Sequence, residues 1–255
     1  MLRVSSALIF AAAALGAAAW FPCAPAHCET DTIREAMVGA AARDAHVHLP
    51  IVGRFMSETG STFILDRSGP AILFRFEHSP EIWALRPTAG PGGDTIYKND
   101  LDQPVVRISR LGGLTVFTTQ RPMGAPAMLE GEGAPFHPPL LSAQALLQLL
   151  VRDSARASRS AERLIRFDAE PIPGSEFVIA DAAGVASEAL VQLAAIREGR
   201  PLLERVKKVR LSVGRRSDVH FHAGVLEITV FPKAGLAGRP SSGRIARAIV
   251  EGAES

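Results

Sequence analysis

Short runs of alternating apolar and polar residues occupy the first half of the chain. Successive side chains of a β-strand point to opposite faces of a sheet, so this alternation predicts strands. The runs cover residues 62–67, 71–77, 81–86, 95–98, 105–109 and 114–118. They begin about every 8–12 residues and are separated by turn-forming residues, which is typical of a sandwich or a barrel. The pattern therefore predicts an antiparallel β-unit, sandwich-like or barrel-like, over residues 45–121.

The second half of the chain has a different pattern. Residues 122–139 are rich in proline and glycine, which predicts a linker or a surface loop. Periodicity and capping residues predict helices at residues 29–43, 140–167, 182–198 and 241–251, and strands at residues 176–180, 208–213, 219–222 and 225–231. The sequence thus predicts an α+β protein in which a mixed helix and strand region over residues 140–252 follows the β-unit. Because the last strands could complete the first sheet, one shared core and two domains are both left open.

The N-terminal residues 1–26 have the form of a signal peptide. Arg3 supplies a positive start, residues 4–20 supply an apolar core, and residues 24–26 read Ala-Pro-Ala, an A-x-A-like cleavage site. The apolar run is short for a membrane span, which needs ~20 residues, and an uncleaved anchor is the alternative. We therefore expect an exported protein, either periplasmic or secreted.

Net charge limits the possible partners of the chain, and cysteine content limits its disulfides. The whole chain has a formal net charge of +2, and removal of Arg3 with the leader lowers the 28 basic residues to 27 against 26 acidic ones. So small a charge gives no general attraction to nucleic acid, and we expect no nucleic-acid partner. Cleavage after Ala26 leaves Cys28 as the one remaining cysteine, which excludes a disulfide within the mature chain.

Two histidine pairs are candidates for a metal site. His46 and His48 follow Asp44, and this D-x-H-x-H pattern resembles the first metal-binding strand of amidohydrolase-type metalloenzymes. His220 and His222 repeat the spacing near the other end of the chain. Residues i and i+2 share one face of a strand, so four imidazoles could hold zinc or copper if the two strands met. Against this, a barrel of that family needs ~250 residues of alternating strands and helices. Two ordinary histidine pairs at strand edges are the alternative.

Five arginines are spaced three and four residues apart in the predicted helix over residues 140–167. They are Arg152, Arg156, Arg159, Arg163 and Arg166. Side chains with this spacing are neighbours on a helix surface, and their guanidinium groups could hold the phosphates of an anionic lipid. That interpretation would imply peripheral contact with a membrane. The alternative is a solvated helix face that Asp153 and Glu162 partly neutralise.

Motifs typical of catalysis are absent from the sequence. The glycine-rich residues 90–94 lack the Lys-Ser or Lys-Thr and the helix that a phosphate-binding loop requires, and we interpret them as a turn. Ser241 and Ser242 precede a predicted helix, where an N-cap explains their hydroxyl groups. Four aspartates, Asp66, Asp94, Asp100 and Asp102, lie at strand ends or turns where aspartate is common. The sequence therefore favours a non-catalytic role and does not settle whether the protein is an enzyme.

Four stretches read together resemble a known family. They are residues 63–68, 92–100, 110–118 and 238–245. They resemble an uncharacterised family of secreted proteins from alphaproteobacteria, which is defined by a domain of unknown function. The likeness covers nearly the whole mature chain and implies an envelope location. It supplies no functional residues.

The leading hypothesis is an exported envelope protein with a binding or structural role and no cofactor. The first alternative is a metal-binding protein or metal-dependent hydrolase with zinc at His46, His48, His220 and His222. The second alternative is a peripheral binder of anionic lipid through the arginine-striped helix. The sequence identifies no partner and no oligomeric state.

Overall fold

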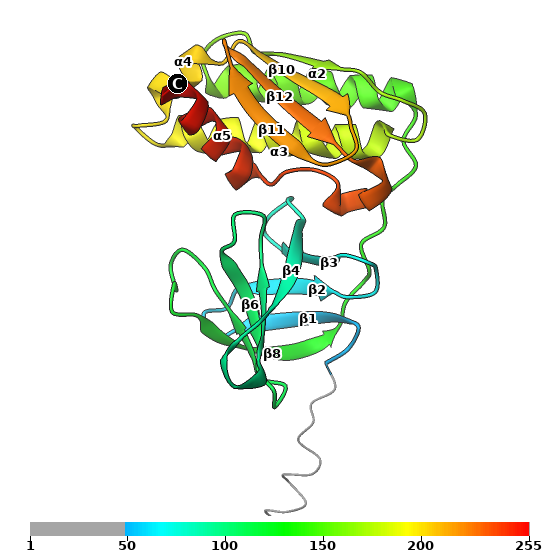
Figure 1. Ribbon diagram of the computed structural model, residues 1–255, viewed down its shortest axis with the longest axis vertical. Helices are drawn as coiled ribbons and strands as arrows, with labels where there is room; N and C mark the ends of the chain where they lie inside the picture. The colour runs from blue at the N-terminus through cyan, green and yellow to red at the C-terminus, as the bar shows by residue number, and fades with distance from the viewer. Residues whose placement is uncertain (1–48, 255) are drawn as a thin grey trace, which may run out of the picture. The chain divides into compact units, whose positions relative to one another are not determined.

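The computed structural model describes residues 49–254, and these residues group into one compact unit. Along the chain, a β-barrel comes first and a layer of helices on a mixed sheet follows (Figure 1). This arrangement confirms the α+β class. The predicted signal peptide over residues 1–26, the predicted helix over residues 29–43, and His46 and His48 lie outside the described residues.

Eight antiparallel strands form a closed barrel. They are β1 (Val52–Ser57), β2 (Thr62–Asp66), β3 (Ile72–Phe76), β4 (Trp83–Ala89), β5 (Thr95–Lys98), β6 (Pro104–Ile108), β7 (Leu114–Val116) and β8 (Ala125–Glu132); a single 3-10 turn, η1 (Pro91–Gly93), separates β4 from β5. Each strand pairs with the next one in the chain, and β8 pairs with β1. Closure leaves the sheet without a free edge, which removes the usual site of edge-to-edge aggregation.

The expectation of a linker over residues 122–139 was wrong in part, because residues 125–132 form strand β8. It pairs its backbone with β1 on one side and with β7 on the other. Most of its side chains are exposed, including Met128 and Leu129, while Ala125 is buried in the barrel. A strand with this composition shows no apolar alternation, so its hydrogen-bonded partners, and not its own pattern, make it a strand.

Aromatic rings fill the barrel. Phe55, Phe63 and Phe74 are fully buried, with ring centroids 5.5 Å apart for the first two and 5.1 Å apart for the last two. Trp83 stacks on Phe74 with a centroid distance of 5.8 Å. Such pairs contribute ~0.5–1.5 kcal/mol beyond the burial of their area. A row of rings therefore runs from β1 to β4 and ends at Trp83, which is only partly buried.

Arg54 of β1 links the turn after β3 to β8, the strand with which β1 closes the barrel. Its Nε donates to Oε1 of Glu77 at 2.6 Å and its Nη2 donates to Oε2 at 3.0 Å. It also forms an ion pair with Glu130 of β8. The hydrogen bond from Arg54, assisted by one from Thr62, lowers the pKa of the Glu77 carboxyl from its ordinary value of 4.5 to about 2.

The second region is a four-stranded sheet covered by helices. Its elements are α2 (Ala143–Ser160), β9 (Arg166–Ala169), α3 (Glu176–Ala195), α4 (Arg200–Arg205), β10 (Lys208–Val213), β11 (Asp218–His222), β12 (Val225–Val230), the 3-10 segment η2 (Pro232–Ala237) and α5 (Ser242–Glu254). The strand order is β11-β12-β10-β9. β9 and β12 run parallel to β10, and β11 is antiparallel to β12.

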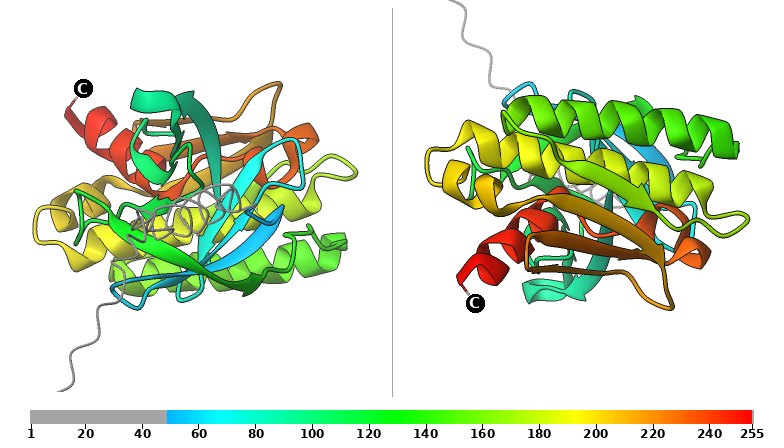
Figure 2. Two further views of the ribbon diagram at one scale, coloured as in Figure 1. Left: turned by 90° about the horizontal axis from the view of Figure 1, so that it is seen from below. Right: turned by 90° about the horizontal axis from the view of Figure 1, so that it is seen from above.

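Each helix of this region packs on a particular part of the sheet. α2 contacts β9, α3 contacts β10 and β12, and α5 contacts β11. α2 and α3 also lie side by side, as the right-hand view of Figure 2 shows in green and yellow. Buried residues such as Leu211, Phe221 and Ile228 face this layer, while Arg210 and Glu227 are exposed on the other face. The buried apolar residues form two clusters, one here and one in the barrel, so the strands over residues 208–231 do not complete the first sheet.

Two predicted elements in this region were wrong. The helix expected over residues 140–167 ends at Ser160, because Ile165 turns into the core and residues 166–169 join the sheet as β9. The strand expected over residues 176–180 is instead the first turn of α3. Short apolar runs do not distinguish strand from helix by themselves, and here the run continues into a buried helix face.

α3 is long and apolar enough, on length and composition alone, to cross a membrane. In the structure it packs against α2, α4 and α5 and on the sheet. Ile179, Ala183, Ala186 and Leu190 on this helix are fully buried. Its apolar residues are therefore accounted for by packing in the core between the helices and the sheet.

Two carboxylates of the barrel bind the first residues of α5. Glu81, between β3 and β4, accepts hydrogen bonds from the backbone N of Ser242 at 2.9 Å and from its Oγ at 2.5 Å. Asp100, between β5 and β6, accepts from the backbone N of Ser241 at 2.8 Å and from its Oγ at 2.6 Å. The first N–H groups of a helix have no partner within the helix, and the positive end of the helix dipole favours negative charge. Both interactions therefore hold the barrel's hairpins to α5.

Arg239 completes this junction from the segment before α5. Its side chain is 2% exposed. Its Nε donates to Oδ2 of Asp181 at 2.5 Å, and its Nη2 donates to the carbonyl oxygen of Ile82 at 2.9 Å. Glu81 lies 3.8 Å from the same guanidinium group. A buried charge is costly unless it is paired, so the arginine depends on both carboxylates.

Replacing Glu81 with glutamine tests this junction. The change keeps the size of the side chain but leaves Arg239 with one carboxylate and weakens the bonds to Ser242. We expect the free energy of unfolding to fall by about 3 kcal/mol, near the lower end for breaking a buried pair. Urea denaturation measures it. Asp102→Asn is the control, because it breaks the exposed pair with Arg86 and should cost less than about 1 kcal/mol. Equal losses in the two variants would contradict the assignment.

The Glu77 carboxyl provides a test of the bond between Arg54 and Glu77 by pH titration. The folded state binds the ionised form more strongly than the unfolded state does, so this contribution to stability is present above pH 4.5 and is lost as the pH falls towards 2. Carbon-detected NMR should give a midpoint near 2 for Glu77. Arg54→Met should return the midpoint towards 4.5. An ordinary midpoint in the unmodified protein would show that Arg54 does not bind the Glu77 carboxylate.

Candidate functional site

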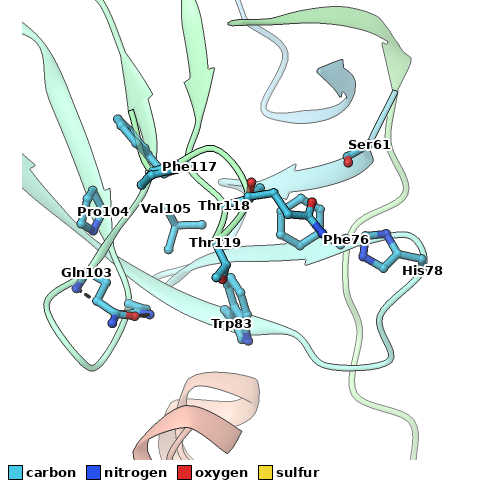
Figure 3. A pocket seen from close by; sticks show the side chains of 13 residues that line it. Ser61, Phe76, His78, Trp83, Gln103, Pro104, Val105, Phe117, Thr118 and Thr119 are labelled. Atoms are coloured by element: carbon cyan, nitrogen blue, oxygen red, sulfur yellow. Dashed lines mark hydrogen bonds between the residues drawn. The ribbon is translucent and has the colours of Figure 1, made fainter. Parts of the chain in front are cut away.

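A pocket of about 550 Å³ opens at one end of the barrel (Figure 3). In an up-and-down barrel, alternate connections meet at the same end. The connections β1–β2, β3–β4, β5–β6 and β7–β8 meet here, and each supplies residues to the lining. The volume falls within the range of ~300–1,000 Å³ that is typical of small-molecule sites, and barrel mouths are common places for them.

One wall of the pocket is aromatic. Phe76 at the end of β3 and Trp83 at the start of β4 meet edge to face, with centroids 6.0 Å apart and an interplanar angle of 88°. The ring of His78 lies 5.3 Å from that of Phe76. Because Trp83 also stacks on the buried Phe74, the core of the barrel holds its indole ring in place. The pocket therefore has a rigid apolar surface with a polar indole N–H group at one edge.

Amide side chains lie on the facing side of the pocket, beside apolar residues such as Pro104. Gln103 and Pro104 lie across the pocket from Phe76 and His78 in Figure 3. Asn99 holds the β5–β6 turn: its Oδ1 accepts from the backbone N of Gln103 at 3.0 Å and its Nδ2 donates to the Oε1 of Gln103 at 3.2 Å. Within the part of the chain that the structure describes, Nε2 of Gln103 has no hydrogen-bond partner. Its two N–H groups are therefore available to a ligand.

The lining carries almost no charge. Among the residues that line this pocket, His78 is the one titratable side chain. Thr118 keeps a hydroxyl proton to donate, because its Oγ1 accepts a hydrogen bond from the backbone N of Arg121 at 3.1 Å. No hydrogen bond joins Ser61 to His78 within the described residues. The arrangement thus suits the binding of an uncharged ligand with an apolar face and polar edges.

Two of the four connections around the pocket are those that bind α5. Glu81 lies two residues before Trp83, and Asp100 directly follows Asn99. The bonds from Ser241 and Ser242 therefore fix both the aromatic wall and the amide side. The C-terminal region in this way positions a pocket to which it contributes no lining residue.

The structure places His220 and His222 on β11, where both side chains are exposed. Nε2 of His220 lies 3.1 Å from Oδ2 of Asp218. Within the described residues, no group of three or more His, Cys, Asp and Glu side chains could hold a metal ion. Because His46 and His48 lie outside those residues, the four-histidine site stays a prediction.

The five arginines do not share a single helix face, because α2 ends at Ser160. Three of them lie on α2, namely Arg152, Arg156 and Arg159, whereas Arg163 and Arg166 lie beyond its end. Arg156 forms an ion pair with Glu188 of α3, and Arg163 donates to the carbonyl oxygen of Glu204. The prediction that all five arginines form one stripe on a single helix was therefore wrong. Binding of an anionic lipid at the remaining arginines stays a prediction.

The aspartates at the turns have structural partners. Oδ1 of Asp66 accepts from the hydroxyl of Ser68 at 2.6 Å. Asp94 accepts from Nε of Arg107 at 2.6 Å, and this hydrogen bond lowers the pKa of its carboxyl. These bonds hold turns in place, as the sequence analysis expected for aspartates at such positions.

Sequence reasoning did not single out the pocket residues. Phe76, Trp83, Gln103 and Thr118 lie far apart in the chain, at strand ends that look ordinary one by one. The barrel's closure brings those ends together. With that topology known, the signal would have been aromatic or amide residues at three of the four connections on that end, β3–β4, β5–β6 and β7–β8.

One family model matches the chain, and its description is "Domain of unknown function (DUF4908)". The match covers residues 32–249, which includes the whole barrel and most of the helical region. No curated protein and no solved structure matches the chain. The match spans well over half of the sequence. The chain therefore belongs to the family defined by the domain of unknown function DUF4908.

Proposed function

We propose that this chain is a non-catalytic binding protein of the cell envelope, whose ligand enters the pocket at the end of the barrel. One observation carries the proposal: the pocket sets a fixed aromatic wall against unpaired amide and hydroxyl groups, and it holds almost no charge. Such a lining can orient a ligand by direct contact. It requires no reaction to explain it.

A neutral sugar is the ligand class that suits this lining. A sugar ring has an apolar face that can pack on Phe76 and Trp83, and hydroxyl groups that can bond to Gln103 and Thr118. A wholly apolar ligand would bury those polar groups without partners, at a cost of ~1–3 kcal/mol each. A charged ligand would find no opposite charge among the lining residues. The chemistry therefore favours an uncharged, hydroxyl-rich ligand.

Export supports this ligand class, because an exported protein meets the glycans of the envelope. The support comes from the N-terminal pattern of a positive residue, an apolar run and Ala24-Pro25-Ala26. The resemblance to secreted proteins of a family without known function points in the same direction.

Cell fractionation tests the export. We expect the protein in the periplasmic or secreted fraction, with an intact mass that corresponds to a chain beginning at His27. Arg3→Glu together with Leu8→Asp should keep the full-length chain inside the cell, because both changes weaken an export signal. Recovery of the unmodified chain at full length from the cytoplasm would refute export.

Intrinsic fluorescence tests the pocket. The chain has two tryptophans, and removal of residues 1–26 leaves Trp83 alone to report on the aromatic wall. We expect saturable changes in its emission with neutral mono- and disaccharides, and weaker changes with hexuronic acids of the same size. Gln103→Leu should weaken binding by about two- to tenfold, which corresponds to ~0.5–1.5 kcal/mol for one neutral hydrogen bond.

Gln148→Leu is the matched control for this titration, because Gln148 is an exposed glutamine on α2 outside the pocket. It should bind as the unmodified protein does. If Gln103→Leu binds sugars as tightly as Gln148→Leu, or if no neutral sugar binds, the sugar proposal fails.

A further inference from the structure

A second cavity, of about 270 Å³, lies between α2 and α3 and is separate from the barrel pocket. Its walls are largely apolar, with Leu141, Leu149, Phe177, Ala180 and Val185 among the lining residues. The volume is just below the range of ~300–1,000 Å³ for small-molecule sites. A ligand at this place must therefore be small and must present apolar surface to the helices.

Asp153, in the middle of α2, lines this cavity. Its side chain is 2% exposed, and Oδ1 accepts a hydrogen bond from Nε of Arg152 at 3.0 Å. Oδ2 is buried and has no hydrogen-bond partner among the residues that the structure describes. An unpaired buried acceptor is destabilising, and native proteins contain few of them. A strong acceptor is thus held in an apolar cavity without a donor from the described chain.

Gly184 of α3 faces the same oxygen. A Cβ at this position would lie 3.7 Å from Oδ2 of Asp153 and would meet no other atom within 4 Å outside the neighbouring turns of α3. Glycine inside a helix is less stable than alanine, and the backbone here has no positive φ that would require glycine. The missing methyl group keeps space open beside the unpaired oxygen.

The cavity's remaining charges favour a cation. Glu81, Asp181 and Glu188 add three carboxyl groups to that of the buried aspartate, against the guanidinium groups of Arg152 and Arg156 in the lining and that of Arg239, which pairs with Glu81 and Asp181. All three arginines are engaged by these four carboxylates, which leaves an excess of one negative group. An excess of negative groups in a cleft with apolar walls attracts positive ligands. An ammonium group carries up to three N–H donors and no acceptor, which matches the free oxygen.

We propose that this cavity binds a small organic ammonium ion, whose N–H group bonds to Oδ2 of Asp153 and whose apolar body packs against Phe177 and Val185. A bare metal ion suits the site less well, since the described residues contain no cluster of three or more ligating side chains. The site is independent of the sugar-binding role, because the two pockets share no lining residue.

Isothermal titration calorimetry of the purified mature chain tests the proposal with cyclohexylammonium chloride as the probe. Cyclohexanol is the matched neutral probe, because it has the same ring without the charge. We expect saturable binding of cyclohexylammonium and at least tenfold weaker binding of cyclohexanol. Two variants should each lower the affinity for cyclohexylammonium at least tenfold: Asp153→Asn, which replaces the acceptor, and Gly184→Ala, which covers it.

Stability measurements separate a binding role from a structural one. If Oδ2 had a structural role, Asp153→Asn would lower the melting temperature. If Oδ2 has no partner, we expect little change in the melting temperature. Gly184→Ala should melt at the same temperature or higher, because alanine favours the helix. Asp168→Asn is the control, because it removes the same charge from the exposed face of β9 and should leave the affinity unchanged.

Three results would overturn the proposal. They are the absence of saturable cyclohexylammonium binding to the folded chain, equal binding by Asp153→Asn, and an equal loss of affinity in the Asp168→Asn control. If Asp153→Asn does not fold, Gly184→Ala decides the question, and unchanged affinity in that variant overturns the proposal. Gln103→Leu should weaken sugar binding but leave cyclohexylammonium binding intact. The sugar proposal and the ammonium proposal can therefore be refuted independently.

Discussion

A single buried guanidinium group, that of Arg239, determines how the two regions of this chain are joined. A charge removed from water must find partners of fixed direction, and Asp181, Glu81 and the carbonyl oxygen of Ile82 provide them. Apolar contacts alone would allow the barrel's hairpins to shift on α5 at small cost. Directional bonds to Arg239, Ser241 and Ser242 set one position.

That position matters because the joined hairpins are also the walls of the barrel pocket. Trp83 follows Glu81 by two residues, and Asn99 precedes Asp100. Trp83 of the aromatic wall is thus fixed in two ways. It stacks on Phe74 of the barrel core, and Ser242 of α5 binds the nearby Glu81. A pocket held in this way can bind a neutral ligand without first paying to order its own walls.

Six strands of the barrel, β2 to β7, were readable from the sequence because burial on one face imposes alternation on Phe63, Leu65 and Phe74 and their neighbours. β1 was not among the predicted runs. β8 was not readable, because its side chains are mostly exposed and only its backbone partners define it. The end of α2 was missed for a related reason. The chain turns after Ser160 so that Ile165 can pack in the core, and no typical capping residue in the sequence marks the end of the helix.

The candidate sites depended still more on topology. The pocket residues meet only because the barrel closes, and the unpaired oxygen of Asp153 stands out only once Gly184 is seen opposite it. In the sequence analysis Asp153 was a charge that offsets nearby arginines. Its burial, which only the packing of α2 on α3 reveals, gives it another role.

The pairing of β1 with β8 has a consequence for the order in which the chain assembles. Every other pairing in the barrel joins neighbours in the sequence and can form early, whereas this one must close a loop over most of the barrel's length. Arg239 and the serines that hold the pocket's hairpins come later still, near the end of the chain. During synthesis from the N-terminus, the barrel can therefore close before its binding end is fixed. The protein gains a complete pocket only when its last helix has been made.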